Sequence, residues 1–438
     1  MTPAARTEEA IRLLERIGDA AATEPADAIL AGHFRRNRYI GAKDRRALGD
    51  LVYATLRGQA ALDWWVERGA GRAPAARLRV LAALALIDGL PPGEIMARFD
   101  GSKHGPAPLD PAERLIVAAL AGQALDHEAQ PGWVRGNYPL WLEPALAESF
   151  GARLAAEMAA LNRPAPVDLR VNALKATRDE ARAALAAEGV EAEPTPLSPL
   201  GLRLAGRGTL PALAAFRAGL VEVQDEGSQI LALLLDARPG QQVVDYCAGA
   251  GGKTLAMAAA MANRGRLVAG DVATVRLGAL APRLARAGVT IVETAAGEAA
   301  LAALPAAAFD RVLVDAPCSG TGTWRRNPEA RWRLTPEMLE RHAAQQRAIL
   351  SAASRLVKPG GRLLYATCSV LAVENDRQME GFLGRHDDFA ALPVAPVWRA
   401  TLGADAPADA VEGARPWLHL TPARHGTDGF FAAVAVRR

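Results

Sequence analysis

The sequence is poor in cysteine, with only three among 438 residues. So small and odd a number excludes a disulfide framework and is typical of a protein kept in a reducing cytosol. No segment reaches about 18 uncharged apolar residues, so no membrane span is expected. The N-terminus contains acids in an amphipathic rhythm and lacks the apolar stretch of a signal peptide. The seven histidines are scattered, and without zinc-type Cys/His spacing no metal site is expected.

Length and charge set further bounds on the protein. A chain of 438 residues is too long for one ordinary core, so two or three domains are expected. A net charge of +3 and a pI of about 8.9 permit a nucleic-acid partner without requiring one. The Arg- and Lys-rich segment 34–46, FRRNRYIGAKDRR, is either a solvated helix end or a phosphate-contacting surface.

The spacing of apolar residues divides the chain into three regions. Residues 1–130 show helical spacing almost throughout and predict an all-helical domain. Residues 140–220 predict a small α/β module, in which a helix begins after Thr177 and ends at Gly189; a helix through 143–162 is also expected. Residues 221–438 alternate strands and helices, which predicts a doubly wound parallel sheet with an antiparallel strand from GFFAAVAV. Its other strands are expected at 242–247, 266–272, 289–294, 310–316 and 361–368.

A glycine-rich turn, DYCAGAGGKT, lies between the first of these strands and a helix. Glycines there let backbone amides approach a ligand at a helix N-terminus. The next strand ends at Asp271, in a position to accept hydrogen bonds from ribose hydroxyls. The combination indicates a nucleoside cofactor, either a dinucleotide or S-adenosylmethionine, although an ordinary tight turn is the plain alternative.

Two cysteines come just after predicted strands, Cys318 in DAPCSGTG and Cys368 in YATCS. The carboxyl ends of parallel strands share one edge of a sheet, so both thiols are expected at that edge. A lone cysteine is more often a small buried apolar residue, and that interpretation is favoured for Cys247 alone.

These two motifs, taken with CAGAGGKT, resemble the RNA cytosine-5 methyltransferases of the RsmB/NOP family. The resemblance extends along the chain through GAKDRRALGDLVYATLRG, VEVQDEGSQ, RRNPEARW and HGTDGFFAAVAVRR. It implies a Rossmann-like class I methyltransferase domain at 221–438, preceded by a NusB-like RNA-binding domain at 1–130 and an RRM-like module at 140–220. It also implies S-adenosylmethionine as cofactor and RNA as partner.

The resemblance implies separate roles for the two thiols. Cys368 would add to carbon 6 of cytosine and activate carbon 5, which is covalent catalysis, and Cys318 would assist release of the product. DNA cytosine methyltransferases attack with the cysteine of the PC motif instead, so the TCS cysteine favours RNA. Asp315 would hold the base edge near the methyl donor. Lys253 would position the base or the donor, with a plain helix-start lysine as the alternative.

Further site residues follow from the same resemblance. An arginine and tryptophan cluster after Cys318 would contact or stack on RNA, or else be a solvated loop; it comprises Arg325, Arg326, Arg331 and Trp332. The cofactor would lie against Cys247, Ala248, Gly249, Ala250, Gly251, Gly252, Lys253, Asp271, Glu298 and Asp315. Two positions depart from the family pattern. Ala250 replaces a proline, which should loosen the turn, and Glu298 would replace an aspartate that usually follows the third strand.

The resemblance therefore implies an S-adenosylmethionine-dependent RNA cytosine-5 methyltransferase acting on 16S ribosomal RNA, and we expect it to be cytoplasmic and monomeric, with no metal and no membrane association. One alternative is a methyltransferase for another RNA, such as transfer RNA. Another is a noncatalytic RNA-binding or ribosome-assembly factor, against which the intact Cys318, Cys368 and Asp271 argue. A nicotinamide oxidoreductase would leave both thiol motifs unexplained.

Overall fold

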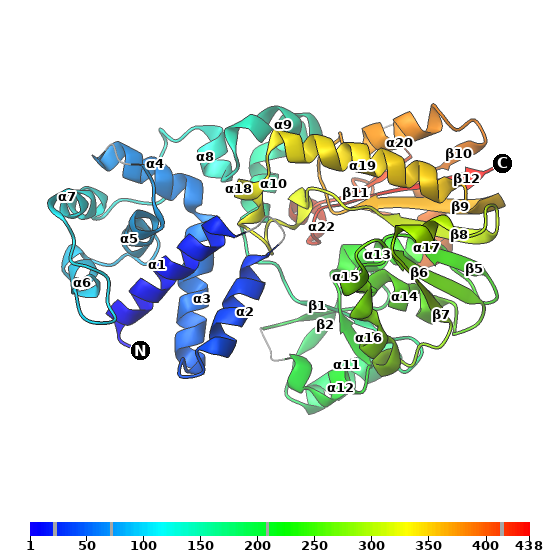
Figure 1. Cartoon of the computed structure of the whole chain (residues 1–438), viewed down its shortest axis with the longest axis horizontal. Helices are drawn as coiled ribbons and strands as arrows, with labels where there is room; N and C mark the ends of the chain where they lie inside the picture. The colour runs from blue at the N-terminus through cyan, green and yellow to red at the C-terminus, as the bar shows by residue number, and fades with distance from the viewer. Residues whose placement is uncertain (21–23, 71–72, 207–209, 412–415) are drawn as a thin grey trace. The chain divides into compact units, whose positions relative to one another are not determined.

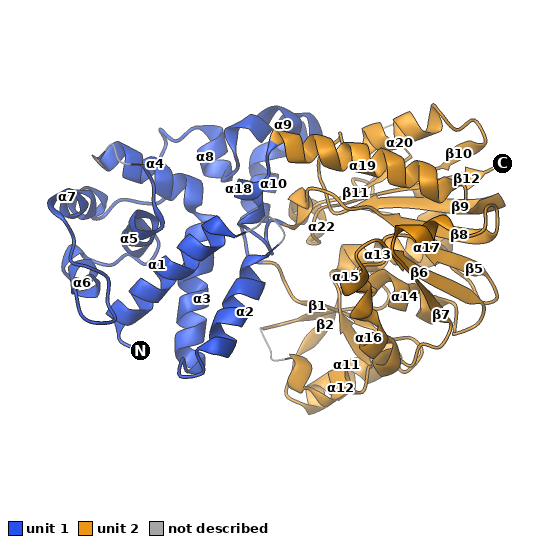
Figure 2. Ribbon diagram, viewed as in Figure 1, with its two compact units in different colours: residues 1–164, 324–335 blue, residues 165–323, 336–438 orange. Residues whose placement is uncertain are grey.

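The computed structural model describes residues 1–20, 24–70, 73–206, 210–411 and 416–438, which form two compact units (Figures 1 and 2). Unit 1 comprises residues 1–164 and 324–335, and unit 2 comprises residues 165–323 and 336–438. The expectation of a multidomain chain with a helical N-terminal region and a Rossmann-like domain is confirmed.

Unit 1 is helical, and its described residues contain no strand. Its apolar core collects side chains from helices far apart in sequence, among them the buried Leu13, Leu48 and Leu81. The start of α7 shows how the sequence sets a helix boundary. Asp110 accepts a hydrogen bond from the amide of Glu113, and the Glu113 carboxylate accepts one from the Asp110 amide. The helices of residues 1–164 are α1 (Pro3–Asp19), α2 (Ala26–Arg36), α3 (Ala42–Arg57), α4 (Gln59–Ala70), α5 (Ala76–Leu86), α6 (Pro92–Arg98), α7 (Pro111–Leu120), α8 (Gly132–Gly136), α9 (Glu143–Phe150) and α10 (Leu154–Leu161).

The helix expected through 143–162 is split into α9 and α10. Gly151 separates them with a φ of +53°, a left-handed conformation that glycine adopts without the steric cost of a side chain. Residues 140–164 also pack with unit 1, whereas the sequence pattern grouped them with the small α/β module.

Residues 324–335 follow the Cys318 motif in sequence but belong to unit 1 (Figure 2). They include the short helix α18 (Ala330–Arg333). The Arg331 guanidinium is fully buried and lies 4.8 Å from the centre of the Trp324 ring. It donates to the carbonyl of Asn137 at 2.6 Å and to the side-chain oxygen of Asn162 at 2.5 Å. Burial lowers the pKa of Arg331 to about 9, so the group stays cationic at neutral pH and the segment is fastened by charge-assisted hydrogen bonds.

Unit 2 begins with a small antiparallel sheet of order β2-β3-β1-β4. The predicted helix is confirmed as α11 (Arg178–Ala187): Thr177 and Glu180 form a reciprocal capping box, and Gly189 follows the helix with a φ of +75°. The strands are β1 (Asp168–Val171), β2 (Ala192–Pro194), β3 (Gly201–Leu204) and β4 (Val221–Val223), and a second short helix is α12 (Ala214–Arg217).

The rest of unit 2 is an eight-stranded sheet of order β10-β12-β9-β8-β5-β6-β7, with β11 paired to β12. The pairs among β5 to β9 are parallel, and β12 runs antiparallel to β9 as expected. The strands are β5 (Gln242–Asp245), β6 (Arg266–Asp271), β7 (Val292–Ala296), β8 (Phe309–Asp315), β9 (Val357–Thr367), β10 (Phe389–Leu392), β11 (Leu418–Leu420) and β12 (Phe430–Arg437). Each expected strand overlaps an observed one. Strand β7 starts later than expected, because residues 289–291 first lead away from the left-handed Gly288, which ends α16 (Leu280–Ala287).

Helices cover both faces of this sheet (Figure 1). On one face, Val243 and Leu313 pack with α13, α14 and α21. On the other, their neighbours Val244 and Val312 pack with α17, α19 and α20. This alternation is what a sheet buried on both sides requires. The helices of this part are α13 (Glu226–Leu234), α14 (Gly252–Ala260), α15 (Thr274–Gly278), α16 (Leu280–Ala287), α17 (Glu298–Ala302), α19 (Pro336–Ser354), α20 (Asp376–Leu383), α21 (Val394–Leu402) and α22 (Pro422–His425).

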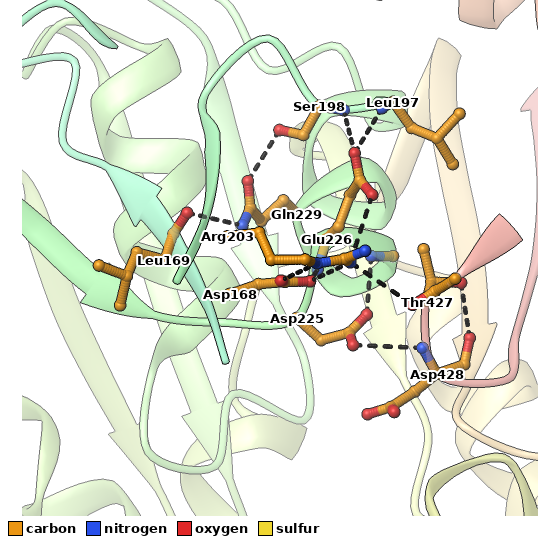
Figure 3. Close-up of polar contacts among 12 residues, drawn as sticks. Asp168, Leu169, Leu197, Ser198, Arg203, Asp225, Glu226, Gln229, Thr427 and Asp428 are labelled. Atoms are coloured by element: carbon orange, nitrogen blue, oxygen red, sulfur yellow. Dashed lines mark hydrogen bonds and ion pairs between the residues drawn. The ribbon is translucent and has the colours of Figure 1, made fainter. Parts of the chain in front are cut away.

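A buried polar network joins the small sheet to α13 and to the loop before β12 (Figure 3). Arg203 on β3 makes a two-pronged contact with Asp168 on β1, at 2.7 and 2.9 Å. Asp168 also accepts from the amide of Glu226 at 3.2 Å, and Asp225 accepts from the amide of Asp428 at 3.2 Å. The network explains why the small module and the larger sheet form one compact unit.

Candidate functional site

The candidate site lies at the carboxyl-terminal ends of β5, β8 and β9. Strand β5 pairs with both β6 and β8, so the strand order reverses there, and ligands of doubly wound sheets bind at such a point. The glycine-rich loop follows β5, Asp315 ends β8, and Cys368 follows β9. Three motifs that span residues 245–368 of the chain thus meet at one edge.

Two positions of the glycine-rich loop require glycine. Gly249 and Gly251 have φ values of +55° and +84°. A β-carbon at Gly251 would also lie 2.1 Å from a methyl group of Leu280. Ala250, where the family has proline, is fixed from outside the loop, because its carbonyl accepts a hydrogen bond from Arg283 at 2.5 Å.

Asp271 holds the glycine-rich loop in place. Its two carboxylate oxygens accept hydrogen bonds from the amides of Gly249 and Ala273, each at 2.7 Å. A carboxylate oxygen has a second lone pair, so a contact to ribose hydroxyls remains chemically open and stays a prediction.

Lys253 and Asp315 form a partly buried ion pair beside the loop. Lys253 lies in the first turn of α14 and its Nζ is 2.7 Å from Oδ2 of Asp315. Burial works against the lysine charge, but the charge of Asp315 and its hydrogen bond raise the pKa of Lys253 above the usual value. The negative charge of a Cys368 thiolate acts in the same direction. A fixed ammonium therefore faces Asp315 and interacts electrostatically with Cys368.

The two motif thiols are in direct contact. The sulfur atoms of Cys318 and Cys368 are 3.4 Å apart, and both residues are partly exposed. The amide of Gly322 donates to the carbonyl of Cys368 at 2.9 Å. Gly322 in turn packs so closely on Gly429 that a β-carbon would lie 2.1 Å from the Gly429 carbonyl oxygen. The C-terminal HGTDGFF segment therefore supports the loops that bring the thiols together.

A cavity of about 250 Å³ opens beside the glycine-rich loop. Asp245, at the end of β5, is its buried acid, with Oδ2 accepting from the Thr254 hydroxyl at 2.6 Å. Its Oδ1 has no hydrogen-bond partner among the described residues, and burial raises the pKa of Asp245 to about 7. The cavity is lined by Val223, Gln224, Ser228, Asp245, Ala248, Ala250, Gly252, Lys253, Arg276, Arg283 and Asp315.

The wall of this cavity includes residues next to the small sheet. Gln224, just past β4, accepts a hydrogen bond from Arg170 on β1. Arg170 also donates to the carbonyl of Gly252 at 2.6 Å, and burial lowers its pKa to about 10. The small module is thereby fastened to the glycine-rich loop itself.

Two other predicted cofactor residues, Cys247 and Glu298, differ in how much they are exposed. Cys247 follows β5 and packs against the core, and burial raises the pKa of its thiol. Glu298 is exposed at the first position of α17, beyond β7.

The predicted RNA cluster is divided by burial. Arg325 and Arg331 are buried in unit 1, whereas Arg326 and Trp332 keep part of their surface exposed. Because the Arg331 guanidinium bonds to Asn137 and Asn162, it is not a surface group, and its role is to fasten residues 324–335 within unit 1.

Sequence reasoning missed four residues that the structure places at or behind the site. Asp245 had a usable signal, since it is an acid near the end of a strand that precedes the glycine-rich loop. Glu374, Arg170 and Arg276 had none, because their positions depend on contacts between distant segments.

Two general expectations can be compared with the described residues. No helix among them is long and apolar enough to cross a bilayer. No group of three or more His, Cys, Asp or Glu side chains is arranged to hold a metal ion in the same part of the chain.

Comparison with known families places this geometry in context. The family model 16S rRNA methyltransferase RsmB/F matches residues 232–435, and the ferredoxin-like domain of RsmF/B-like methyltransferases matches residues 138–210. A Synechocystis protein named "Probable ribosomal RNA small subunit methyltransferase B" is 33% identical over 410 residues, covering 89% of this chain and 90% of the relative. Ribosomal RNA small subunit methyltransferase B of Pectobacterium atrosepticum is 30% identical, covering 91% and 92%.

Solved structures show the same fold. The crystal structure of PH0851 aligns with 100% of this chain and 99% of its own, with a TM-score of 0.78 and 28% identity. A methyltransferase homolog from Pyrococcus horikoshii aligns with 70% of this chain and 98% of its own, with a TM-score of 0.60 and 28% identity.

Proposed function

Because the chain belongs to the RsmB/F family of 16S rRNA methyltransferases, we propose that it methylates carbon 5 of a cytosine in 16S ribosomal RNA through a covalent thiolate adduct. The observation that supports this most is the 3.4 Å contact between the Cys318 and Cys368 sulfurs, beside the Lys253–Asp315 pair. Two thiols in contact at the ligand edge of a parallel sheet have no packing role that smaller apolar residues could not fill.

S-adenosylmethionine is the cofactor of this methyltransferase, and it supplies the methyl group when bound. The cavity beside the glycine-rich loop has the charges that fit it. Asp245, with its unpartnered buried Oδ1, would take the ammonium group. Arg276, which lines the same cavity, would take the carboxylate, and Asp271 the ribose.

The residues around the thiols have separate roles in the proposed reaction. Cys368, as the thiolate, adds to carbon 6 of the extruded cytosine, and the electron pair gained by the ring makes carbon 5 nucleophilic. The Lys253 ammonium stabilises that thiolate and orients Asp315. Asp315 accepts a hydrogen bond from the exocyclic amine of the base and favours protonation of ring nitrogen 3, which assists attack at carbon 6.

Release of product reverses the addition. The carbon 5–hydrogen bond breaks, and its electrons re-form the ring double bond while the proton passes to water. The carbon–sulfur bond breaks with its electron pair returning to Cys368. Cys318, in contact with that sulfur, stabilises the departing thiolate by donating its S–H. Arg326 and Trp332 remain the proposed RNA contacts of the loop that follows.

The substrate is tested by bisulfite sequencing of total RNA from cells with the gene, without it, and with a Cys368→Ala copy. The proposal expects one protected cytosine in 16S rRNA, lost in the deletion and in the Cys368→Ala cells. A site lost from transfer RNA would contradict the ribosomal assignment, and no lost site would contradict cytosine-5 methylation.

The division between the thiols is tested by single substitutions. Cys368→Ala should abolish methyl transfer while leaving S-adenosylmethionine affinity within about twofold, because the loop and cavity are untouched. Cys318→Ala should accumulate a protein–RNA adduct on denaturing gels, because attack proceeds and release stalls. A Cys318→Ala enzyme that turns over normally without an adduct would contradict the assigned roles.

A further inference from the structure

A fully buried carboxylate, Glu374, lies between the two cysteine loops. Its Oε1 accepts from the Ser319 amide at 2.8 Å and from Gln346 Nε2 at 3.1 Å, and its Oε2 accepts from the Ser319 hydroxyl at 2.5 Å. Among the described residues it takes part in no ion pair. A buried charge held only by neutral donors is costly, so the position demands an explanation beyond packing.

The hydrogen bonds of Glu374 fix the backbone on both sides of Cys318. Ser319 is the residue that follows Cys318, and Gln346 also donates to the carbonyl of Pro317, which precedes it, at 2.9 Å. The Ser319 hydroxyl lies 3.3 Å from that of Ser369, the residue after Cys368. Glu374 therefore fixes the Cys318 loop, and Ser319 links that loop to the Cys368 loop.

The charge of Glu374 acts on the thiol itself. The hydrogen bond to Cys368, burial, and the negative charges of Cys368 and Glu374 together raise the pKa of Cys318 well above its usual value. At Cys318 only a backbone hydrogen bond from Gly320 acts in the opposite direction on the pKa, and it is the smallest of these effects, whereas the Lys253 ammonium acts on Cys368. The pair is thus electrostatically unequal, although its members are chemically identical.

We propose that Glu374 is a positioning residue that fixes the Pro317–Ser319 loop and keeps the shared proton of the thiol pair on Cys318. The inference rests on the proposed function, in which Cys368 must be the thiolate. With the proton on Cys318, Cys368 is the free nucleophile at the start of the reaction. At its end, when the carbon–sulfur bond breaks, the returning electron pair on Cys368 meets the same S–H donor.

Other charged and titratable groups face the pair from each surrounding element and set the background for this effect. They are Lys253 on α14, which acts on Cys368, its ion-pair partner Asp315 at the end of β8, and Tyr365 on β9, which interacts with Cys318. The Tyr365 hydroxyl donates to the Glu374 carbonyl at 2.6 Å, and burial, followed by the nearby negative charges, raises its pKa, so it stays neutral over the pH range of interest.

The test is Glu374→Gln in the full-length chain without RNA. The amide oxygen can keep the bonds from the Ser319 amide and Gln346, so the change removes the charge with little change of shape. Iodoacetamide alkylation of Cys318 is followed against pH by peptide mass mapping, which separates it from Cys247 and Cys368. The midpoint for Cys318 is expected to fall by about one pH unit or more, equivalent to roughly tenfold faster alkylation at a fixed lower pH.

The control is Glu293→Gln, which makes the same chemical change in an exposed pair with Arg266 and should leave the Cys318 profile unchanged. An unchanged midpoint in folded Glu374→Gln protein overturns the inference. Because no RNA or methyl transfer enters this measurement, that result would leave the proposed function standing.

A second variant decides the matter if Glu374→Gln does not fold. Ser319→Ala removes one bond to Glu374 and the link to Ser369 while leaving the core intact. A kcat lowered about tenfold, with an unchanged KM for S-adenosylmethionine, supports the positioning role. Wild-type kcat in Ser319→Ala overturns it.

Discussion

At the scale of single residues, the acids of the site differ in how their charges are held. Asp315 is paired with Lys253 at 2.7 Å. Asp271 accepts two backbone amides. Among the described residues, Asp245 has the Thr254 hydroxyl on one oxygen and no hydrogen-bond partner on the other, and burial raises its pKa to about 7. The unused hydrogen-bonding capacity of the buried Asp245 Oδ1 destabilises the fold, and a cationic ligand bound there would remove that cost.

The first prediction concerns Asp245→Asn. The folded-state pKa of about 7 lies above the ordinary value of 3.8, so Asp245 lowers the free energy of unfolding progressively as pH rises from about 4 to about 7, and the loss is complete above 7. Asparagine removes that loss. The free energy of unfolding of the variant should exceed that of the parent by at most roughly 4 kcal/mol at pH 8 and by almost nothing near pH 4. Its affinity for S-adenosylmethionine should fall at least tenfold.

Thermal unfolding at pH 5 and pH 8 checks the stability, and calorimetric titration checks the affinity. The exposed Asp387 supplies the comparison, since Asp387→Asn should change neither quantity. A variant less stable at pH 8 than the parent would show that the carboxylate has a partner in solution.

At the scale of elements, the network of Figure 3 joins β1, β3 and α13. Arg203 is its cation, and both Asp168 and Glu226 have fully buried side chains within its reach, Glu226 at 3.9 Å. The bonds to Asp168 raise the pKa of Arg203. Removing one member of such a network leaves the others charged and buried.

Arg203→Met should accordingly destabilise unit 2 by about 3–5 kcal/mol. Urea unfolding followed by near-UV circular dichroism measures the change as a shift in midpoint. Arg182→Met is the matched control, because its one ion pair among the described residues is with the exposed Glu193 at 4.0 Å, and it should change stability by less than about 0.5 kcal/mol. Equal midpoints for the two variants would contradict the importance of the network.

The elements of this fold were largely predictable because their signals are local. The strands of the parallel sheet are short apolar runs, the start of α11 is marked by Thr177 and Glu180, and the thiols and glycines lie in compact motifs. Contacts between distant segments were not predictable. Glu374 meets Ser319 across 55 residues and Arg331 meets Asn137 across 194, and no local pattern distinguishes these side chains from surface charges.

At the scale of the whole molecule, the chain does not complete one unit before starting the other. It leaves unit 1 after residue 164, returns for residues 324–335, and leaves again. The returning segment brings Trp324 and Arg331, which are both fully buried within unit 1. Unit 2 therefore cannot be isolated by cutting at a single boundary.

A chain beginning at residue 165 should be poorly soluble, because residues 324–335 would lose the surface that buries them and expose Trp324. Replacing 324–335 by a short Gly/Ser linker in that truncated chain should restore solubility several-fold. Sedimentation of expressed protein and limited proteolysis check this, with cleavage expected first within 324–335. Equal solubility of the two truncated chains would contradict the packing of this segment.

The threading of residues 324–335 has a consequence for synthesis on the ribosome. The first 164 residues emerge early, yet the helical core they form lacks Trp324 and Arg331 until translation has passed residue 335. During that interval its docking surface is uncovered while the strands β1 to β8 are being made. The N-terminal helices therefore stay incompletely packed until the segment that follows Cys318 has been made, and they complete their core before Cys368 is synthesised.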